Sequence, residues 1–394
     1  MKNNPPSGLL VANLLAQLAF GLLAMTICIP SMQEWGAIFG ASQASVQLTF
    51  SGYVVAYGGL QLLYGPLSDR IGRKTILMFG LALAGLGSVF GALAPDLGTL
   101  TLARIVQGAG AAASMVVGRA MVQDLFGGPQ RTRVMAYVGM AMGLCPPLAT
   151  IVGGYVHVQI GWQANFVLIA GLAAVLLLAA WRGLPEPPRA EPAATHWLRA
   201  MWDAYVQLAH VPGFAMYVAL LASTTAAFYA FLGGAPIVLG SYGVRPDGIG
   251  WYIMAVPCSY IVGNYVASRL IHRIGERRMM LLGQMATLGG IGLMLVLGLA
   301  GLKTPLAFAL PLMLLGIGHG LLVPPTLAGT VGLVPALAGS AAAVAGVMQQ
   351  LTGAVGGYAV GLFSHDGAVN LGWLMLGLSG LGALAHWRLR RLRR

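Results

Sequence analysis

The sequence predicts an all-α membrane protein with twelve transmembrane helices, and three observations support this class. Of the 394 residues, 58% are hydrophobic and only 8% are charged, whereas a soluble domain carries roughly 25% charged residues. Runs of about 20 apolar residues recur along the chain, which is the length that a helix needs to cross a bilayer. These runs lack the alternation of a transmembrane β-barrel, so helices are the remaining way to satisfy the backbone in lipid.

The apolar runs divide the chain into twelve expected spans. They cover residues 8–30, 44–65, 75–94, 99–123, 132–156, 162–184, 212–238, 247–270, 279–301, 305–327, 337–363 and 367–388. The first run is too long for the apolar core of a signal peptide, and no small-x-small cleavage site follows it. We therefore interpret it as an uncleaved first span.

Most basic residues lie on one side of these spans. With the N-terminus placed in the cytoplasm, 18 of the 22 lysines and arginines fall in cytoplasmic segments. This positive-inside distribution predicts a multi-pass protein of the bacterial inner membrane with both termini in the cytoplasm. The net charge of +12 therefore indicates membrane topology, and we expect no nucleic-acid partner.

A polar linker separates the spans into two groups of six. The interval 185–211 is the longest charged, proline-rich stretch of the chain. We expect it to be cytoplasmic, with a short interfacial helix around 196–209. The predicted domains are an N-terminal six-helix bundle at 1–184 and a C-terminal six-helix bundle at 212–394.

An internal repeat supports this division. Residues 70–72 follow the second span and residues 273–275 follow the eighth, and both read Arg-Ile-Gly at an offset of 203. Gly80 and Gly283 keep the same offset. Transporters built from duplicated bundles bind substrate near the midplane and rock around it. The alternative, that any tight cytoplasmic turn selects Gly and Arg, explains the composition but explains the shared register less well.

Two motifs resemble signatures of the major facilitator superfamily. Residues 65–74 match its loop signature G-x-L-S-D-R-x-G-R-K, and residues 104–110 match its fourth-span signature R-x-x-Q-G-x-G. Residues 47–50, 61–64 and 161–163 further resemble the drug:proton antiporters of the bicyclomycin-resistance (Bcr/CflA) type. The resemblance implies two pseudo-symmetric six-helix bundles, alternating access and multidrug efflux without a cofactor. It covers the first half of the chain and, more weakly, the second.

The loop signature contains a candidate conformational latch. Asp69 and Asp124 lie at the cytoplasmic ends of two expected spans, close to basic residues. Acids and bases at adjacent helix ends can pair in one conformation and part in another. The resemblance favours this function over the alternative of a solvated surface salt bridge. The expected latch residues are Gly65, Asp69, Arg70, Gly72, Arg73 and Asp124.

Arg104 is the main candidate for a substrate site within the membrane. It lies about 8 Å inside the fourth span, where a guanidinium needs a water-filled cavity or a partner. Snorkelling to the periplasmic interface is the alternative. Arg119, nearer the cytoplasm, is interpreted as a structural residue. Other candidates for the cavity wall, each equally consistent with packing, are Asn13, Gln17, Tyr53, Tyr57, Gln61, Tyr229, Tyr252, Gln349 and Gln350.

None of the ten acids falls at mid-membrane in the expected spans, which limits how protons can couple to transport. Thr26 stands where the antiporters commonly have an aspartate, and Thr150 replaces a proline of their fifth-span signature. His319 is then the one mid-span residue whose ordinary pKa suits a proton site. We predict that it couples protons or binds substrate, with a hydrogen-bonded core histidine as the alternative.

These features together predict a secondary active transporter that exports small, largely apolar, neutral or anionic compounds. A lipophilic cation would need a carboxylate in the cavity, and none is expected there. Alternatives are a facilitator or symporter for a small metabolite and, remotely, an integral-membrane enzyme, although no catalytic or metal-binding spacing is evident. We expect a monomer whose partners are the substrate, protons and the lipid bilayer.

Overall fold

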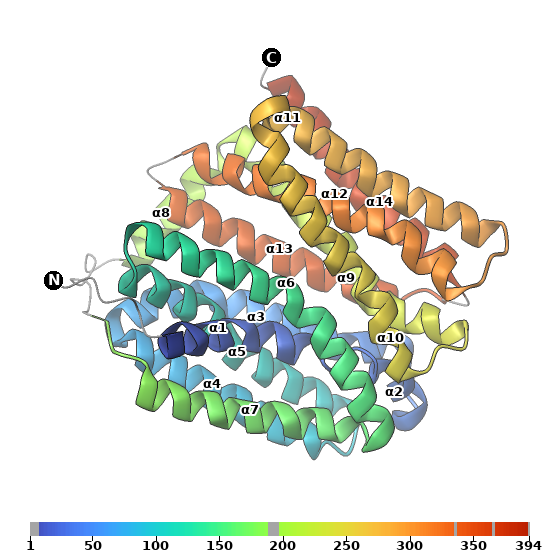
Figure 1. The fold of residues 1–394 in the computed structure, drawn as a ribbon, viewed down its shortest axis with the longest axis horizontal. Helices are drawn as coiled ribbons and strands as arrows, with labels where there is room; N and C mark the ends of the chain where they lie inside the picture. The colour runs from blue at the N-terminus through green and yellow to red at the C-terminus, as the bar shows by residue number, and fades with distance from the viewer. Residues whose placement is uncertain (1–7, 188–196, 335–336, 365–366, 393–394) are drawn as a thin grey trace.

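The computed structural model describes residues 8–187, 197–334, 337–364 and 367–392, and long α-helices make up nearly all of it (Figure 1). Lys2, the linker residues 188–196, Asp366, Arg393 and Arg394 lie outside the described residues. The helices are α1 (Gly8–Thr26), α2 (Met32–Phe39), α3 (Gln43–Ile71), α4 (Arg73–Ala92), α5 (Leu97–Leu125), α6 (Gly128–Gln159), α7 (Trp162–Gly183), α8 (Trp197–Ala209), α9 (Pro212–Ser241), α10 (Pro246–Ile253), α11 (Ala255–Leu299), α12 (Pro305–Gly332), α13 (Ala338–Val360) and α14 (Ala368–Leu392).

Each of the twelve expected spans coincides with helix in the structure. Nine described segments are long and apolar enough to cross a membrane. One of them, Pro246–Leu299, is 54 residues long and is interrupted at Gly275, where φ is 78°, so it supplies two spans. The more polar helices α3 and α13, with 29 and 23 residues, complete the twelve. We call α1–α7 the first half and α9–α14 the second half.

The first span ends earlier than expected, at Thr26 and not at Pro30. Proline has no backbone N–H to continue the helix, and the N–H of Ile29 bonds the carbonyl of Thr26 (3.1 Å). The chain then forms α2, a short helix that the sequence analysis did not anticipate. Trp35 of α2 is fully buried and packs edge-on against Trp162 at the start of α7, with 5.9 Å between ring centroids.

The sequence repeat is visible in the backbone. Helices α3 and α10 begin at Gln43 and Pro246, which keeps the offset of 203. The turns that follow contain Gly72 and Gly275, both with positive φ (122° and 78°), a region that residues with a Cβ rarely adopt. The Arg-Ile-Gly segments are therefore equivalent turns in the two halves.

The next pair of equivalent helices, α5 and α12, starts with equivalent caps. The Asp96 carboxylate accepts a hydrogen bond from the Thr99 backbone N–H (2.9 Å), and the Thr304 hydroxyl accepts one from the Ala307 N–H (3.2 Å). Such caps satisfy backbone donors that the first helical turn leaves free. The hydrogen bonds from Thr99 also lower the pKa of Asp96. The two caps are 208 residues apart, so the second half has gained five residues between its turn and this cap.

Equivalent glycine pairs make close helix contacts in both halves. A Cβ added at Gly80 of α4 would lie 2.6 Å from the carbonyl oxygen of Gly110 of α5. A Cβ added at Gly283 of α11 would lie 2.7 Å from the carbonyl oxygen of Gly318 of α12. Helices in lipid associate largely through close backbone packing at small residues. The same glycine contacts thus hold the same helix pair together in each half.

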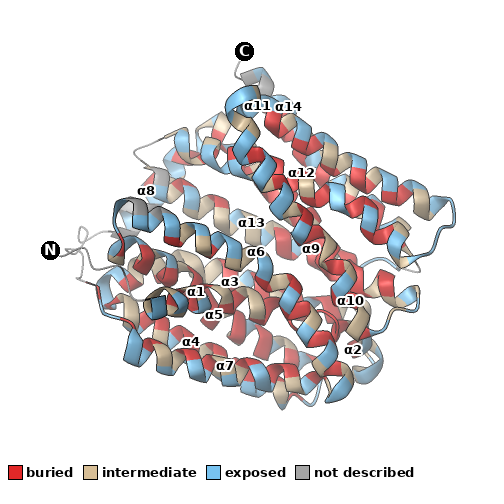
Figure 2. Ribbon diagram, in the orientation of Figure 1, coloured by how far each residue is buried: buried red, intermediate tan, exposed pale blue. Residues whose placement is uncertain are grey.

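The halves meet along α3 with α13 and along α6 with α10, while the outer faces are apolar. Buried residues concentrate on the inward faces of the helices (Figure 2). Large side chains such as Phe90, Leu102 and Trp373 are more than half exposed. An apolar outer surface of this extent is suited to lipid and not to water.

Substituting Gly283 by alanine is expected to destabilise the protein by about 1–3 kcal/mol, because the new Cβ would overlap the α12 backbone. Gly289→Ala on the same helix is the matched control, since no atom lies within 4 Å of a Cβ there. Both variants gain the same helix propensity. Melting of the purified proteins in detergent measures the difference, and equal melting temperatures would show that the α11–α12 contact tolerates a methyl group.

Candidate functional site

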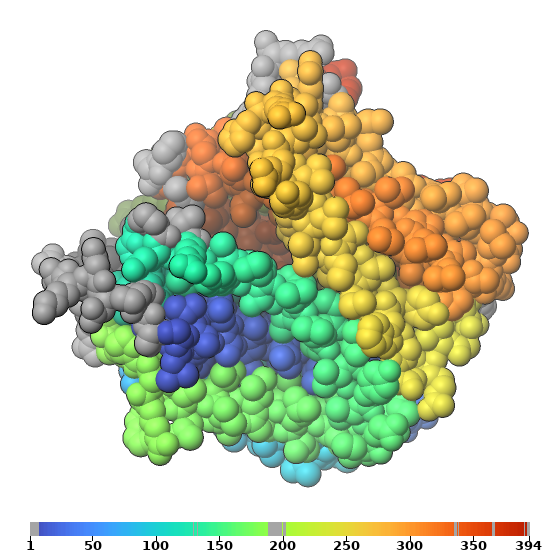
Figure 3. Space-filling view, viewed as in Figure 1, coloured from blue at the N-terminus to red at the C-terminus, as the bar shows by residue number. Residues whose placement is uncertain are grey.

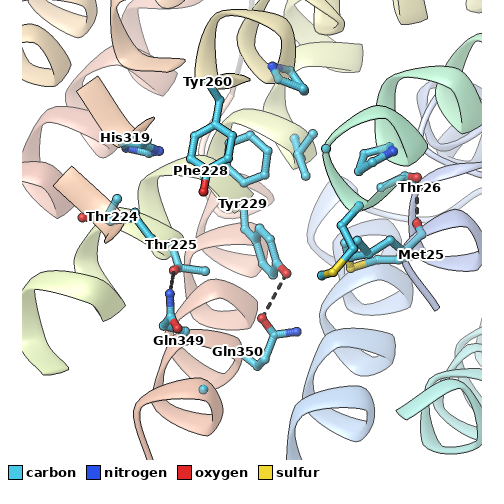
Figure 4. Close-up of a pocket in the computed structure, with 18 of the residues that line it drawn as sticks. Met25, Thr26, Thr224, Thr225, Phe228, Tyr229, Tyr260, His319, Gln349 and Gln350 are labelled. Carbon is cyan, nitrogen blue, oxygen red and sulfur yellow. Dashed lines mark hydrogen bonds between the residues drawn. The ribbon is translucent and has the colours of Figure 1, made fainter. Parts of the chain in front are cut away.

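A cavity of about 500 Å³ lies between the two halves. Its wall comes from α1, α3, α5 and α6 of the first half and from α9, α11, α12 and α13 of the second. Its aromatic and apolar side chains include Met25, Phe228 and Tyr260 (Figure 4). Pockets for small molecules typically have this size, an apolar lining and a few polar groups.

Six of the residues selected from the sequence line this cavity, and hydrogen bonds order several of them. The six are Tyr57, Gln61, Tyr229, His319, Gln349 and Gln350. The Tyr229 hydroxyl donates to Gln350 Oε1 (3.1 Å), and Gln349 Nε2 donates to the Thr225 hydroxyl (3.0 Å) (Figure 4). These two bonds connect α9 to α13 and hold the two amides in the cavity wall.

Asn13, Gln17 and Tyr252 lie outside the cavity in this conformation, contrary to the expectation from the sequence. Asn13 Nδ2 donates to the carbonyl of Ala179 (2.8 Å), and Gln17 Nε2 donates to the carbonyl of Leu176 (2.9 Å). Both amides therefore join α1 to α7. Tyr252 is on α10, where it packs against the apolar core. A polar residue on the inward face of a span can donate a hydrogen bond to a neighbouring helix or face a cavity, and the sequence pattern is the same in both cases.

Arg104 is also not a cavity residue, although it is almost fully buried. Its Nη1 donates to the carbonyl of Ala24 (2.8 Å) and its Nη2 to the carbonyl of Met25 (3.1 Å). The guanidinium lies over the ring of Tyr53, 4.3 Å from the centroid. Tyr53, also expected to line the cavity, instead donates its hydroxyl to the carbonyl of Gly21 (2.7 Å).

The end of α1 explains why an arginine is needed there. Because the helix stops at Thr26, the carbonyls of Ala24 and Met25 lose the partners that a continuing helix would supply. In lipid such groups must be satisfied within the protein. Arg104 satisfies both, and a guanidinium suits the task because its donors form a fixed fork. The expectation of a partner was correct, but the partner is backbone and not substrate.

The sequence analysis missed Arg119 as a cavity residue. This arginine of α5 is exposed, lines the cavity, and has Nη2 3.7 Å from the sulfur of Met142. Positions 115, 116, 122 and 123, three and four residues away along the helix, hold no acid. That lack of a local counterion was the available signal.

His319 lies in the cavity wall on α12 and is buried. Its ring is 6.4 Å from that of Phe228, centroid to centroid, and its Nε2 has no hydrogen-bond partner among the described residues. A polar nitrogen that lines a cavity without a partner can bind a proton, a water or a substrate group. His319 therefore lies in the cavity wall, and its function in proton coupling or substrate binding stays a prediction.

The latch residues gather at the end of the molecule that carries the linker. Arg73 bridges Asp69 (2.5 Å) and Asp124 (2.9 Å), and it donates to the Ser68 hydroxyl (2.7 Å). This network joins the ends of α3, α4 and α5, which all belong to the first half. Gly65 also faces α5, but a Cβ there would be at an ordinary 3.6 Å from Val116, so that contact does not require glycine.

The opposite face is closed by bonds between the halves. Gln47 Nε2 donates to the carbonyl of Gly233 (2.9 Å), and the Ser51 hydroxyl donates to the carbonyl of Ala354 (2.8 Å). Nearby, a Cβ added at Gly250 of α10 would lie 2.7 Å from the backbone of Ile151 in α6. Towards the linker face the space-filling view is hollowed between α6 and α11 (Figure 3).

Known proteins with a similar sequence or fold are membrane transporters. Residues 9–357 and 219–394 match the sequence model of the Major Facilitator Superfamily. Multidrug resistance protein D of Escherichia coli K12 is 26% identical over 383 residues, covering 96% of this chain and 94% of that protein. A chloramphenicol resistance protein of Pseudomonas aeruginosa is 27% identical over 314 residues, covering 78% and 74%. A bacterial homologue of the human lysosomal transporter Spinster, inward-facing and unoccupied, shares the fold (TM-score 0.79, 14% identity, coverage 99% and 98%).

Replacing Arg104 by methionine is expected to destabilise the protein, because the carbonyls of Ala24 and Met25 would be left buried without partners. Each unsatisfied group costs about 1–3 kcal/mol. Arg119→Met on the same helix is the control, since it removes an exposed guanidinium whose contact is to the sulfur of Met142 and not to a backbone carbonyl. Thermal melting in detergent measures both variants. A melting temperature for Arg104→Met equal to that of the control would show that the α1 end does not depend on this arginine.

Proposed function

The chain belongs to the major facilitator superfamily, and we propose that it exports small, largely apolar, neutral or anionic compounds by alternating access. It is a multi-pass secondary transporter and not an enzyme. One observation carries the proposal: the cavity lies between two repeated halves that are bonded together on one face and separated on the other. Relatives named for multidrug and chloramphenicol resistance favour export over uptake.

The separation of the halves is supported by two glycines of the cavity wall. Gly139 of α6 and Gly346 of α13 line the cavity, and a Cβ at either would meet no atom within 4 Å. A Cβ added at Gly58 of α3, beside the cavity-lining Tyr57, would instead collide with the side chain of Gln350 in α13. A cavity that is roomy towards one face and tightly packed towards the other corresponds to one end state of an alternating-access cycle.

The basic residues give this state a direction. The linker face carries the arginines that the positive-inside rule assigns to the cytoplasm, so the cavity would load from the cytoplasm in an inner membrane. We infer that Asp69, Arg73 and Asp124 act as a latch when the halves close on that face. In the present state Arg73 pairs with both acids within the first half. When the halves close on this face, the acids could exchange Arg73 for basic residues of the second half.

The lining of the cavity supports neutral or anionic substrates. The described wall residues include no aspartate or glutamate, whereas Arg119 supplies a fixed positive charge. A lipophilic cation would have to leave water without a counterion, which costs several kcal/mol. We further propose that transport is coupled to protons through His319, because this residue is the titratable imidazole in the described wall.

Ser51→Ala removes a hydrogen bond that joins the halves on the face opposite the linker. We expect it to increase the population of the conformation in which the halves are closed on the linker side instead. Loss of one hydrogen bond of about 1 kcal/mol would shift the ratio of the two states about fivefold. Spin labels attached through Arg133→Cys and His272→Cys, in a background without native cysteines, would report the separation of the halves. Ser223→Ala is the control, since the Ser223 hydroxyl donates to the carbonyl of Ala219 within its own helix. Identical distance distributions in the two variants would contradict the assignment.

A transport assay in proteoliposomes tests the function itself. Labelled chloramphenicol should exchange across the membrane and should accumulate when a pH gradient is imposed. His319→Gln should abolish gradient-driven accumulation but retain exchange, because the glutamine cannot carry the proton. His210→Gln, on the exposed end of α8, is the control. Intact accumulation by His319→Gln would exclude this coupling site, and efficient transport of the cation ethidium would contradict the proposed charge selectivity.

A further inference from the structure

We propose that the cavity binds the anionic group of its substrate through Arg119 and Tyr57, and so prefers amphipathic organic anions over their neutral analogues. The substrate would have an aromatic or aliphatic body and a single carboxylate or similar group. This inference rests on the proposed transport function, because it identifies the substrate class of the same cavity. It assigns to Arg119 the charge recognition that the sequence alone suggested for Arg104.

Among the described residues, no acid forms an ion pair with Arg119. The contact from its Nη2 is to the sulfur of Met142 (3.7 Å), which is a weak acceptor. Asp124 lies five residues further along α5 but pairs with Arg73. Arg119 is exposed within the cavity, and an anion that enters can pair with it beside an apolar wall, where their attraction is screened less than in bulk water.

The hydroxyl of Tyr57, in the first-half wall of the cavity, has no hydrogen-bond partner among the described residues. Tyr57 is 2% exposed. Its ring stacks on that of Tyr53, with 5.9 Å between centroids, so its position is fixed. Tyr57 and Arg119 both line the first-half side of the cavity. A guanidinium and a free hydroxyl in one wall offer two kinds of donor to an anionic group.

The rest of the cavity wall suits the apolar part of such a substrate. Met115 and Met142 flank the region of Arg119, and methionine adapts to ligands of different shapes. Across the cavity the second half contributes Phe228, Tyr229 and Tyr260 (Figure 4). A substrate with its anion on the first half and its ring on the second would contact both halves at once. Such a substrate can influence how the halves move relative to each other.

A pair of nearly isosteric probes tests the inference: 2-naphthoate, which is anionic, and 2-naphthamide, which is neutral. Binding of each to the purified full-length protein is followed by tryptophan fluorescence or calorimetry. The wild type should bind 2-naphthoate at least about tenfold more tightly than 2-naphthamide, which corresponds to about 1.4 kcal/mol. Arg119→Gln and Tyr57→Phe should each weaken 2-naphthoate about tenfold and change 2-naphthamide less than about threefold. Arg119→Lys should retain the preference for the anion.

Arg133→Gln is the matched control, because this exposed arginine of α6 contacts Tyr137 and does not line the cavity. It should bind both probes as the wild type does. Equal affinity of the wild type for the two probes, or failure to bind 2-naphthoate at millimolar concentrations, would overturn the inference. Equal loss of both probes in Arg119→Gln would also overturn it, since it would make Arg119 a structural residue.

The outcome is separable from that of the proposed function. Transport of a neutral compound such as chloramphenicol, without any preference for 2-naphthoate, would leave the export function standing and refute the anion site. Selective binding of 2-naphthoate in a protein that moves no compound across proteoliposomes would do the reverse. Binding and transport are therefore measured on the same preparations.

Discussion

The requirement that every backbone polar group in lipid find a partner within the protein governs this structure, and the end of α1 is where it acts most visibly. Pro30 stops the helix early, and two carbonyls would be left bare in the middle of the first half. Arg104 reaches from α5 to bind both of them. The side chain of Met25 then projects into the cavity wall. A buried arginine that serves the backbone thus helps to shape the surface that a substrate would meet.

The distribution of polar contacts between the halves follows the same physics. Side chains that cross between halves bind backbone carbonyls, as Gln47 and Ser51 do, so closure of that face relies on short, directional bonds and on glycine contacts. The charged network around Arg73 lies instead at the linker end of the molecule, partly exposed and within one half. Opening a neutral hydrogen bond inside the protein costs less than separating an ion pair there, whereas ion pairs are tolerated where water can solvate the separated charges.

The sequence was sufficient to predict the twelve spans, the repeat and the family, because these depend on composition, periodicity and local motifs. The turns at Gly72 and Gly275 were predicted as equivalents and share a positive φ. Helix α2 and the placement of Asn13 and Gln17 could not be predicted. Helical periodicity identifies the inward face of a span but does not distinguish a neighbouring helix from a cavity, and both amides bind carbonyls of α7.

The two arginines of α5 show why the cavity itself was harder to predict than the fold. Arg104 lies about 8 Å inside its span and Arg119 lies about 22 Å further along the same helix, nearer the cytoplasm, and the sequence analysis favoured the former as the substrate site. Burial, however, makes a charge costly, and in the buried Arg104 both Nη1 and Nη2 already bind backbone carbonyls. Arg119 has, among the described residues, the weak contact with Met142. In a membrane transporter, the charge that remains unpaired beside the cavity is therefore the one available for a substrate, and recognising it requires the three-dimensional contacts of both residues.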